Sequence, residues 1–123
     1  MPLDRIHAVL ALDIDHFKQI NDTGGRPAGD QQLIGRADAW RNMFSANAIL
    51  ARLGGDEFAV CIAERAGPTP TTANQFVADV RLHTPGTSIG TAARSGESAD
   101  IALLYGAADS NLYTAKHQRF PDT

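Results

Sequence analysis

The hydrophobic positions along the chain form short apolar runs and longer stripes with a helical period, which predicts a domain of mixed α and β structure. The run IHAVLALDI at residues 6–14 is almost entirely apolar and has no helical stripe, so it predicts a buried strand. Further short apolar runs predict strands at residues 49–53, 58–62 and 87–92. Paired glycines join the first two of these, which is typical of a hairpin because the turn needs positive φ.

Helical patterns fill the intervals between the strands. A short helix is expected at residues 16–21, ended by a glycine-rich stretch, and Asp30 then stands where the N-cap of a second helix belongs. A third helix is expected after a cap at Thr71 or Thr72, and a fourth after Asp100. The apolar faces expected for the last three helices comprise Leu33, Ile34, Ala37, Trp40 and Phe44, then Phe76, Val77 and Val80, then Ile101, Leu104, Tyr105, Ala108, Leu112 and Ala115.

The predicted order of elements is β, α, α, β, β, α, β, α. This order fits a four-stranded sheet with helices on one face, an α+β architecture of the ferredoxin-like kind. With 123 residues, 43% of them hydrophobic, the chain has the size of one domain with a single packed core.

Composition narrows the classes of function. Lys and Arg number 11 against 14 Asp and Glu, which argues against a protein that coats nucleic acid but permits a local site for a small phosphate ligand. An RNA-binding ferredoxin-like module is disfavoured as well, because the central strands lack paired aromatic residues. No apolar run approaches the roughly 20 residues that cross a bilayer. The single cysteine, Cys61, excludes an intrachain disulfide framework and a cysteine-rich zinc site, so we expect a soluble domain of a reducing compartment.

Two groups of acidic residues do not fit a purely structural interpretation. Asp13 and Asp15 end the most apolar strand, where an ionised carboxylate is costly unless it meets a cation, hydrogen-bond donors or water. Asp56 and Glu57 stand at the tip of the glycine hairpin, and in the expected fold they can converge with Asp13. Clustered carboxylates favour Mg²⁺ or Mn²⁺ over zinc, and Mg²⁺ sites commonly serve phosphates, for which Lys18 is a candidate counter-charge.

Each of these signals also has an ordinary structural explanation. The DxD sequence can be a solvated strand end, GGDE can be a simple hairpin turn, and Asp30 can be only a helix cap. The functional hypothesis depends on their combination and spacing.

Five sequence blocks occur in the order typical of one known family. They are LDIDHFKQIND (12–22), GRPAGD (25–30), ARLGGDEF (51–58), TSIGTA (87–92) and ADSNLYTAK (108–116). The sequence resembles the GGDEF domains, the diguanylate cyclases that condense two GTP molecules into cyclic di-GMP. The resemblance implies one GGDEF-type domain over residues 1–123, with a nucleotide-cyclase-like core and a mainly antiparallel central sheet.

The resemblance also implies a role for each matching residue. Asp13, Asp56 and Glu57, together with the backbone carbonyl of Ile14, would hold two Mg²⁺ or Mn²⁺ ions per half-site on the GTP phosphates. Either Asp56 or Glu57 would act as metal ligand or base at the attacking hydroxyl, and the sequence does not separate these roles. Guanine would be bound by Asn21 and Asp30, the phosphates by Phe17, Lys18, Lys116 and Arg119, and room for the nucleotide would be left by Gly54 and Gly55.

The implied reaction is attack of the 3′-oxygen of one GTP on the α-phosphorus of another. Because one domain offers one half-site, this reaction requires a homodimer at least transiently. The resemblance thus implies a cytoplasmic enzyme of bacterial signalling that has no membrane segment in this chain and binds no nucleic acid. The alternative is a non-catalytic sensor domain that binds GTP or cyclic di-GMP without turnover.

Departures from the family pattern bear on that alternative. We expect the helix and DxLTGLxNR-type segment that usually precede the first strand to be absent, and Arg26 replaces the usual histidine of GHxxGD. The inhibitory RxxD motif corresponds to SANA at residues 45–48, so no product-inhibition site of that type is expected. The KxxGRN ending reads KHQRF, with the glycine missing and Arg119 one place early. The intact GGDEF sequence with Asp13, Asn21 and Asp30 nevertheless favours catalysis.

Overall fold

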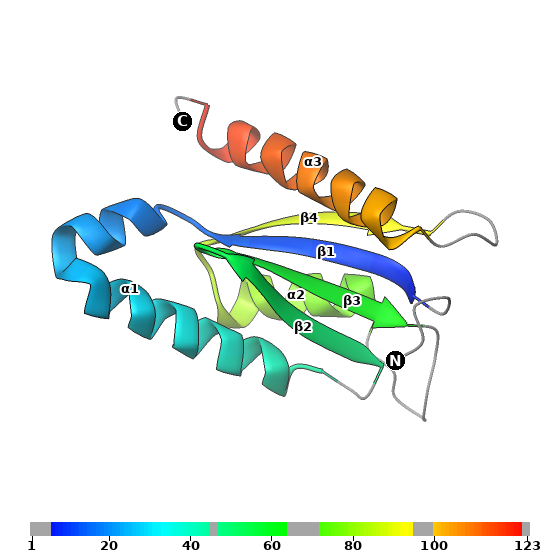
Figure 1. Ribbon diagram of the computed structural model, residues 1–123, viewed down its shortest axis with the longest axis horizontal. Coiled ribbons are helices and arrows are strands. Elements are labelled where there is room, and N and C mark those ends of the chain that lie inside the picture. The colour runs from blue at the N-terminus through cyan, green and yellow to red at the C-terminus, as the bar shows by residue number, and fades with distance from the viewer. Residues whose placement is uncertain (1–5, 45–46, 64–71, 95–99, 122–123) are drawn as a thin grey trace.

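The computed structural model of the protein describes residues 6–44, 47–63, 72–94 and 100–121. In these residues a four-stranded antiparallel sheet with the order β2-β3-β1-β4 forms the centre of the molecule (Figure 1). The strands are β1 (Ile6–Ile14), β2 (Ala48–Gly54), β3 (Glu57–Ala63) and β4 (Thr87–Ala93), and the helices are α1 (Phe17–Asn42), α2 (Ala73–His83) and α3 (Ile101–Arg119). The predicted α+β class and antiparallel sheet are confirmed.

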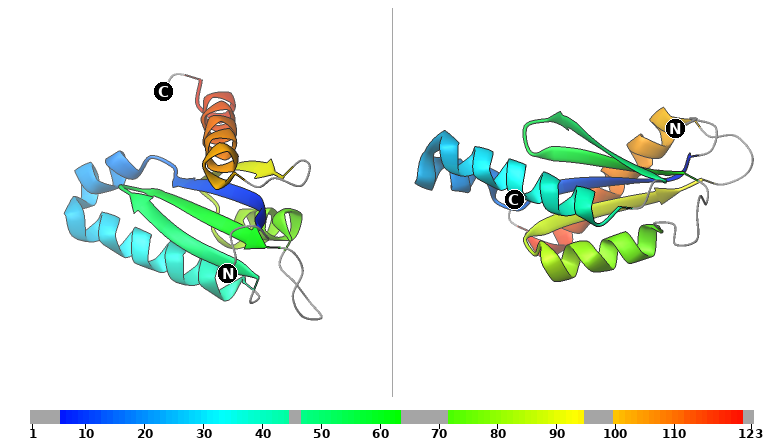
Figure 2. Two further views of the ribbon diagram at one scale, coloured as in Figure 1. Left: turned by 45° about the vertical axis from the view of Figure 1, so that its right-hand side comes forward. Right: turned by 90° about the horizontal axis from the view of Figure 1, so that it is seen from below.

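Helices cover both faces of the sheet, so the expectation that they pack on one face is wrong. In Figure 2, α1 and α2 lie on one side of the sheet and α3 lies on the other. Leu12 of β1 belongs to a core cluster with Trp40 of α1 and Phe76 of α2. Ala11, which points to the opposite face, belongs to a second cluster with Leu112 of α3. The nearly continuous apolar run of β1 follows from this burial on both sides.

The glycine-rich stretch interrupts α1, which consists of two helical parts joined across a kink, so the predicted break is confirmed. Gly25 has a non-helical conformation within α1, with φ 80° and ψ 172°, and Pro27 follows where the helix resumes. Asp30 therefore lies inside α1 beyond the kink, and the prediction that it is an N-cap is wrong. Ile34, expected on the buried face, is 63% exposed.

The caps predicted for the other two helices are confirmed. Thr72 accepts a hydrogen bond from the backbone N–H of Gln75 at the start of α2. Asp100 accepts hydrogen bonds from the backbone N–H groups of Ala102 and Leu103 at the start of α3. Within the described residues, no helix combines the length and the hydrophobicity that crossing a membrane requires.

Gly90 of β4 lets α3 rest directly on the sheet. A Cβ atom added at Gly90 would collide with the backbone carbonyl oxygen of Ala108 and the backbone nitrogen of Leu112. Neither obstacle is a side chain that could rotate away, so the helix itself would have to move. The absence of a side chain at Gly90 therefore sets the distance between α3 and the strands that carry the acidic residues.

We predict that Gly90→Ala lowers the free energy of unfolding by about 1–3 kcal/mol, because it forces α3 away from the sheet. The matched control is Gly106→Ala in α3, where an added Cβ meets nothing within 4 Å. That change is expected to raise the free energy of unfolding by up to about 1 kcal/mol through helix propensity. Chemical denaturation measures both, and equal effects of the two substitutions would contradict the packing described.

Candidate functional site

A cavity of about 710 Å³ opens between the end of β1, the start of α1, the β2–β3 turn and the second half of α3. Among its lining residues are many that the sequence predicted for the site: Asp13, Ile14, Phe17, Lys18, Asn21, Asp56, Glu57 and Lys116. The structure thus brings the candidate metal ligands, two candidate phosphate-binding lysines and one candidate guanine-binding residue to a single cavity.

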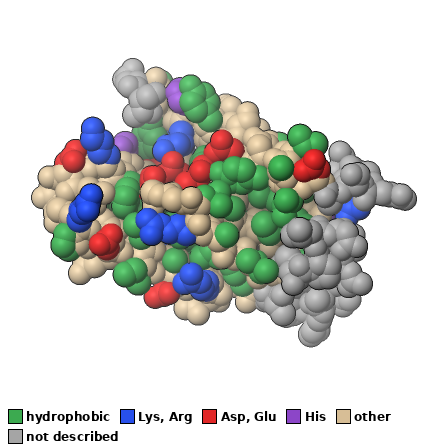
Figure 3. Space-filling model, viewed as in Figure 1, with side chains coloured by type: hydrophobic (Ala, Val, Ile, Leu, Met, Phe, Trp, Pro, Cys, Tyr) green, Lys and Arg blue, Asp and Glu red, His purple; other side chains and the backbone are tan. Residues whose placement is uncertain are grey.

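Strand register explains why the acidic residues meet. Asp13 of β1 lies opposite Glu57 of β3, and on its other side opposite Ser88 of β4. Side chains that lie opposite one another in a sheet project from the same face, and here that face is the one beneath α3. Figure 3 shows acidic side chains gathered where the β2–β3 turn approaches α3, with hydrophobic side chains beside them.

Asp13 sits in the most demanding electrostatic environment of the site. Its Oδ2 atom lies 2.7 Å from Nζ of Lys116, whereas its buried Oδ1 atom has no hydrogen-bond partner. Burial raises the pKa of Asp13 to about 7, assisted by the adjacent Asp56 carboxyl and opposed by Lys116. A bound cation would offset both the lost hydration of this unpartnered oxygen and its repulsion from the second carboxylate.

The carboxylates of Asp13 and Asp56 fit a magnesium-type ion better than a closed metal centre. In the described part of the chain, no three His, Cys, Asp or Glu side chains gather closely enough to hold a metal by themselves. Mg²⁺ typically takes one or two carboxylates from the protein and completes its octahedron with waters and substrate phosphates. The pair therefore suits a metal that arrives with a phosphate ligand.

The structure separates the environments of Asp56 and Glu57, which the sequence could not. Asp56 lies beside Asp13. Glu57 instead accepts a 2.7 Å hydrogen bond from the Tyr105 hydroxyl and has the Asp109 carboxyl within hydrogen-bonding reach. Burial, followed by Asp109, raises the pKa of Glu57, and the hydrogen bond from Tyr105 opposes that rise.

Tyr105 and Asp109 are site residues that sequence reasoning missed. Tyr105 reads as part of the apolar stripe of α3, although the structure leaves it only partly buried. The available signal was the spacing of four between the two residues, which places both on one side of a helix.

The start of α1 is suited to an anion. His16 precedes the helix with φ 57° and makes no side-chain capping hydrogen bond, and the first turn contains no acidic residue. The backbone N–H groups of a first turn without a side-chain cap attract phosphate. His16, Phe17 and Lys18 all line the cavity, so this helix start borders the site.

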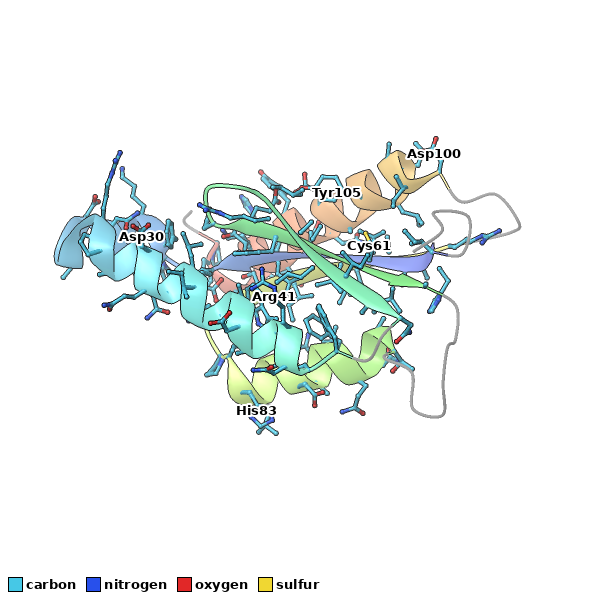
Figure 4. The ribbon with its side chains drawn as sticks, turned by 60° about the horizontal axis from the view of Figure 1, so that its bottom comes forward. Asp30, Arg41, Cys61, His83, Asp100 and Tyr105 are labelled. Carbon is cyan, nitrogen blue, oxygen red and sulfur yellow. The ribbon has the colours of Figure 1, made fainter. Side chains whose placement is uncertain are left out.

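Asp30 does not line the cavity, but the structure connects it to Asn21, which does. A Cβ atom added at Gly29 would collide with Oδ1 of Asn21, so the residue before Asp30 packs directly on the Asn21 side chain. Asp30 itself is exposed on α1 (Figure 4). Gly54 and Gly55 form the hairpin beside the acids, with φ 138° and 53°, and are also absent from the lining.

Arg119 is not brought to this cavity. Its guanidinium lies 2.9 Å from Oδ2 of the buried Asp15 and donates to the Thr87 carbonyl oxygen at 3.1 Å and to Ser88 Oγ at 3.2 Å. Arg119 lines a separate cavity at the start of β4. The positions that correspond to RxxD fall partly on residues 45–46, outside the described residues, so the expected lack of that motif's site stays a prediction.

Comparison with known proteins places this arrangement in a family. The sequence model described as "Diguanylate cyclase, GGDEF domain" matches residues 3–121. Diguanylate cyclase TpbB of Pseudomonas aeruginosa is 38% identical over 123 residues, covering 90% of this chain and 28% of TpbB. The probable diguanylate cyclase DgcE of Escherichia coli is 32% identical over 121 residues, covering 90% of this chain and 11% of DgcE. The chain thus spans under a third of these relatives.

Solved structures agree with the sequence matches. The GGDEF domain of TpbB from Pseudomonas aeruginosa is 34% identical, with a TM-score of 0.71, covering 90% of this chain and 76% of that one. The active GGEEF domain of a diguanylate cyclase from Vibrio cholerae is 27% identical, with a TM-score of 0.79, covering 94% of this chain and 80% of that one. The chain therefore belongs to the GGDEF domain family of diguanylate cyclases.

Proposed function

We propose that this chain is the catalytic domain of a diguanylate cyclase, which joins two GTP molecules into cyclic di-GMP. The observation that carries the proposal is one cavity lined by the Asp13 and Asp56 carboxylates, by Lys116 and by the start of α1. Carboxylates for a divalent cation, an ammonium group and an anion-attracting helix start are the groups that a nucleoside triphosphate requires.

In this proposal Asp13, Asp56 and Glu57, with the carbonyl oxygen of Ile14, hold two Mg²⁺ or Mn²⁺ ions per half-site. The bound metal neutralises charge on the phosphates and lowers the pKa of the attacking 3′-hydroxyl. The unpartnered Oδ1 atom of Asp13 supports a cation at this point.

The basic groups of the cavity then serve the phosphates. Lys116 is bonded to Asp13 in the structure, and a cation that neutralises Asp13 would leave its ammonium group to a phosphate oxygen. Lys18 is exposed at the start of α1 and can approach the same phosphates together with the backbone N–H groups of that turn.

Asn21 and Asp30 are proposed to read guanine. A carboxylate can accept from both N1–H and N2–H of guanine, a donor pair that adenine lacks. The close packing of Gly29 on Asn21 supports the proposal, because it holds the two parts of the kinked α1 together.

Two such cavities must face each other for the reaction, since each is proposed to hold one GTP. A homodimer, at least transient, is therefore part of the proposal, and the rate of product formation should rise more steeply than linearly with protein concentration. A substrate such as GTP also fits a cytoplasmic location.

We predict that the chain at high concentration converts GTP to cyclic di-GMP with Mg²⁺ or Mn²⁺, and that Asp56→Asn lowers the rate by about a hundredfold or more. The control is Asp38→Asn, which removes an acid that is 66% exposed and paired with Arg41, away from the cavity. Chromatography of the products measures both. GTP binding without any cyclic di-GMP in the parent protein would contradict the proposal and indicate a non-catalytic sensor.

The raised pKa of Asp13 makes the stability of the cation-free protein depend on pH. The unfolded chain has the ordinary pKa of 3.8 and the folded protein a pKa of about 7, so folding tightens the binding of this proton. The resulting stabilisation is complete below about pH 4 and is lost as the pH rises through about 7.

We therefore predict that, in a chelator, the melting temperature falls as the pH rises from about 5 to about 8, and that Asp13→Asn shows a smaller fall. Mg²⁺ is expected to raise the melting temperature of the parent more at the higher pH, where Asp13 is ionised. Thermal unfolding at both pH values, with and without Mg²⁺, tests this. The same pH response in parent and variant would show that Asp13 is not the titrating group.

A further inference from the structure

The hydroxyl of Tyr105 is a polar group of the site to which the proposed function assigns no task. It donates to Oε2 of Glu57 at 2.7 Å, from a ring that is partly buried between α3 and the sheet. Figure 4 shows Tyr105 on α3.

The surroundings of Glu57 make this hydrogen bond important. The charged groups that act on Glu57 are the carboxyls of Asp109 and Asp56, and the ammonium group of Lys116 is bonded to Asp13 instead. Within the described residues, the donor recorded on the Glu57 carboxylate is the neutral Tyr105 hydroxyl. Without this hydrogen bond, repulsion from Asp56 and Asp109 would drive the flexible Glu57 side chain away from the other acidic residues of the cavity.

We propose that Tyr105 is a positioning residue. Its hydroxyl holds the Glu57 carboxylate beside the other acidic residues of the cavity, where Glu57 can bind the metal or act on the reacting hydroxyl. This inference rests on the proposed function. A neutral donor suits the task, because it orients the carboxylate without cancelling the negative charge that attracts a cation. A lysine or arginine at this position would compete with the metal.

The hydroxyl and the ring of Tyr105 have different roles in this proposal. The ring packs against the cluster formed by β1 and α3, so a larger truncation would disturb the fold as well as the hydrogen bond. Tyr105→Phe retains the ring and removes only the donor. Effects of this variant on the site can therefore be assigned to the hydroxyl, provided that its cation-free melting temperature stays close to that of the parent.

The test is a double-mutant cycle of Tyr105→Phe and Glu57→Gln. The first readout is the Mn²⁺ concentration that gives half of the thermal stabilisation, measured with a non-hydrolysable GTP analogue and therefore independent of turnover. We expect Tyr105→Phe to raise this concentration about tenfold in the parent and to leave it unchanged in the Glu57→Gln background. An unchanged midpoint in the parent, or an equal shift in both backgrounds, would overturn the proposal.

The second readout is turnover of GTP. Loss of a group that orients Glu57 should lower kcat about tenfold while KM for GTP changes little, because Tyr105 acts through Glu57 and not on the nucleotide. A rise in KM at constant kcat would overturn the positioning role. If the parent makes no cyclic di-GMP, the proposed function fails. The double-mutant cycle measured by thermal stabilisation still decides the role of Tyr105.

A spectroscopic measurement checks the hydrogen bond if Tyr105→Phe fails to fold. The chain has two tyrosines and one tryptophan, so in Tyr113→Phe the only phenol is Tyr105, and a difference spectrum cancels the unchanged absorbance of Trp40. Tyr113 lines the cavity, and this variant serves only as a spectroscopic background. We expect Glu57→Gln to shift the Tyr105 absorbance, because donation to a carboxylate is replaced by donation to an amide. An absorbance that does not respond would show that the hydroxyl does not contact Glu57.

Discussion

Burial of β1 on both faces is the constraint on which the rest of the structure depends. The strand lies between β3 and β4 in the sheet, with α1 and α2 beneath it and α3 above it. Its end carries Asp13, whose side chain is 15% exposed and therefore poorly solvated. A carboxylate held there costs free energy unless another group compensates for the lost water. The Lys116 ammonium group compensates for the lost water at Oδ2 of Asp13, whereas Oδ1 of the same carboxylate has no hydrogen-bond partner.

The acids of the hairpin divide between two environments because of the register of β3 on β1. Glu57 lies opposite Asp13 and points toward α3, where it meets Tyr105 and Asp109. Asp56 lies in the turn itself, acts on the Asp13 carboxyl and lines the cavity with it. Asp13 and Asp56 thus line the cavity in which a cation and its phosphates are proposed to bind, while Glu57 is hydrogen-bonded to Tyr105 of α3.

Features set by neighbouring residues were predictable from the sequence, whereas those set by packing were not. The bounds of β1, the caps of α2 and α3 and the meeting of Asp13 with the hairpin acids follow from local pattern and strand order. The break at Gly25 was also predictable, because glycine and proline interrupt helices, but the continuation of α1 through Asp30 beyond it was not. The close approach of α3 to the second face depends on Gly90, and the pairing of Arg119 with Asp15 joins distant parts of the chain. Tyr105 looked like core, because its hydroxyl partner lies on another element.

The most direct test of this account is anomalous diffraction from crystals grown with Mn²⁺ and a non-hydrolysable GTP analogue. The account predicts a manganese peak between the carboxylates of Asp13 and Asp56, with a triphosphate reaching the start of α1 and Lys116 turned from Asp13 to a phosphate oxygen. Manganese and nucleotide bound elsewhere, with the bond between Lys116 and Asp13 intact, would contradict it.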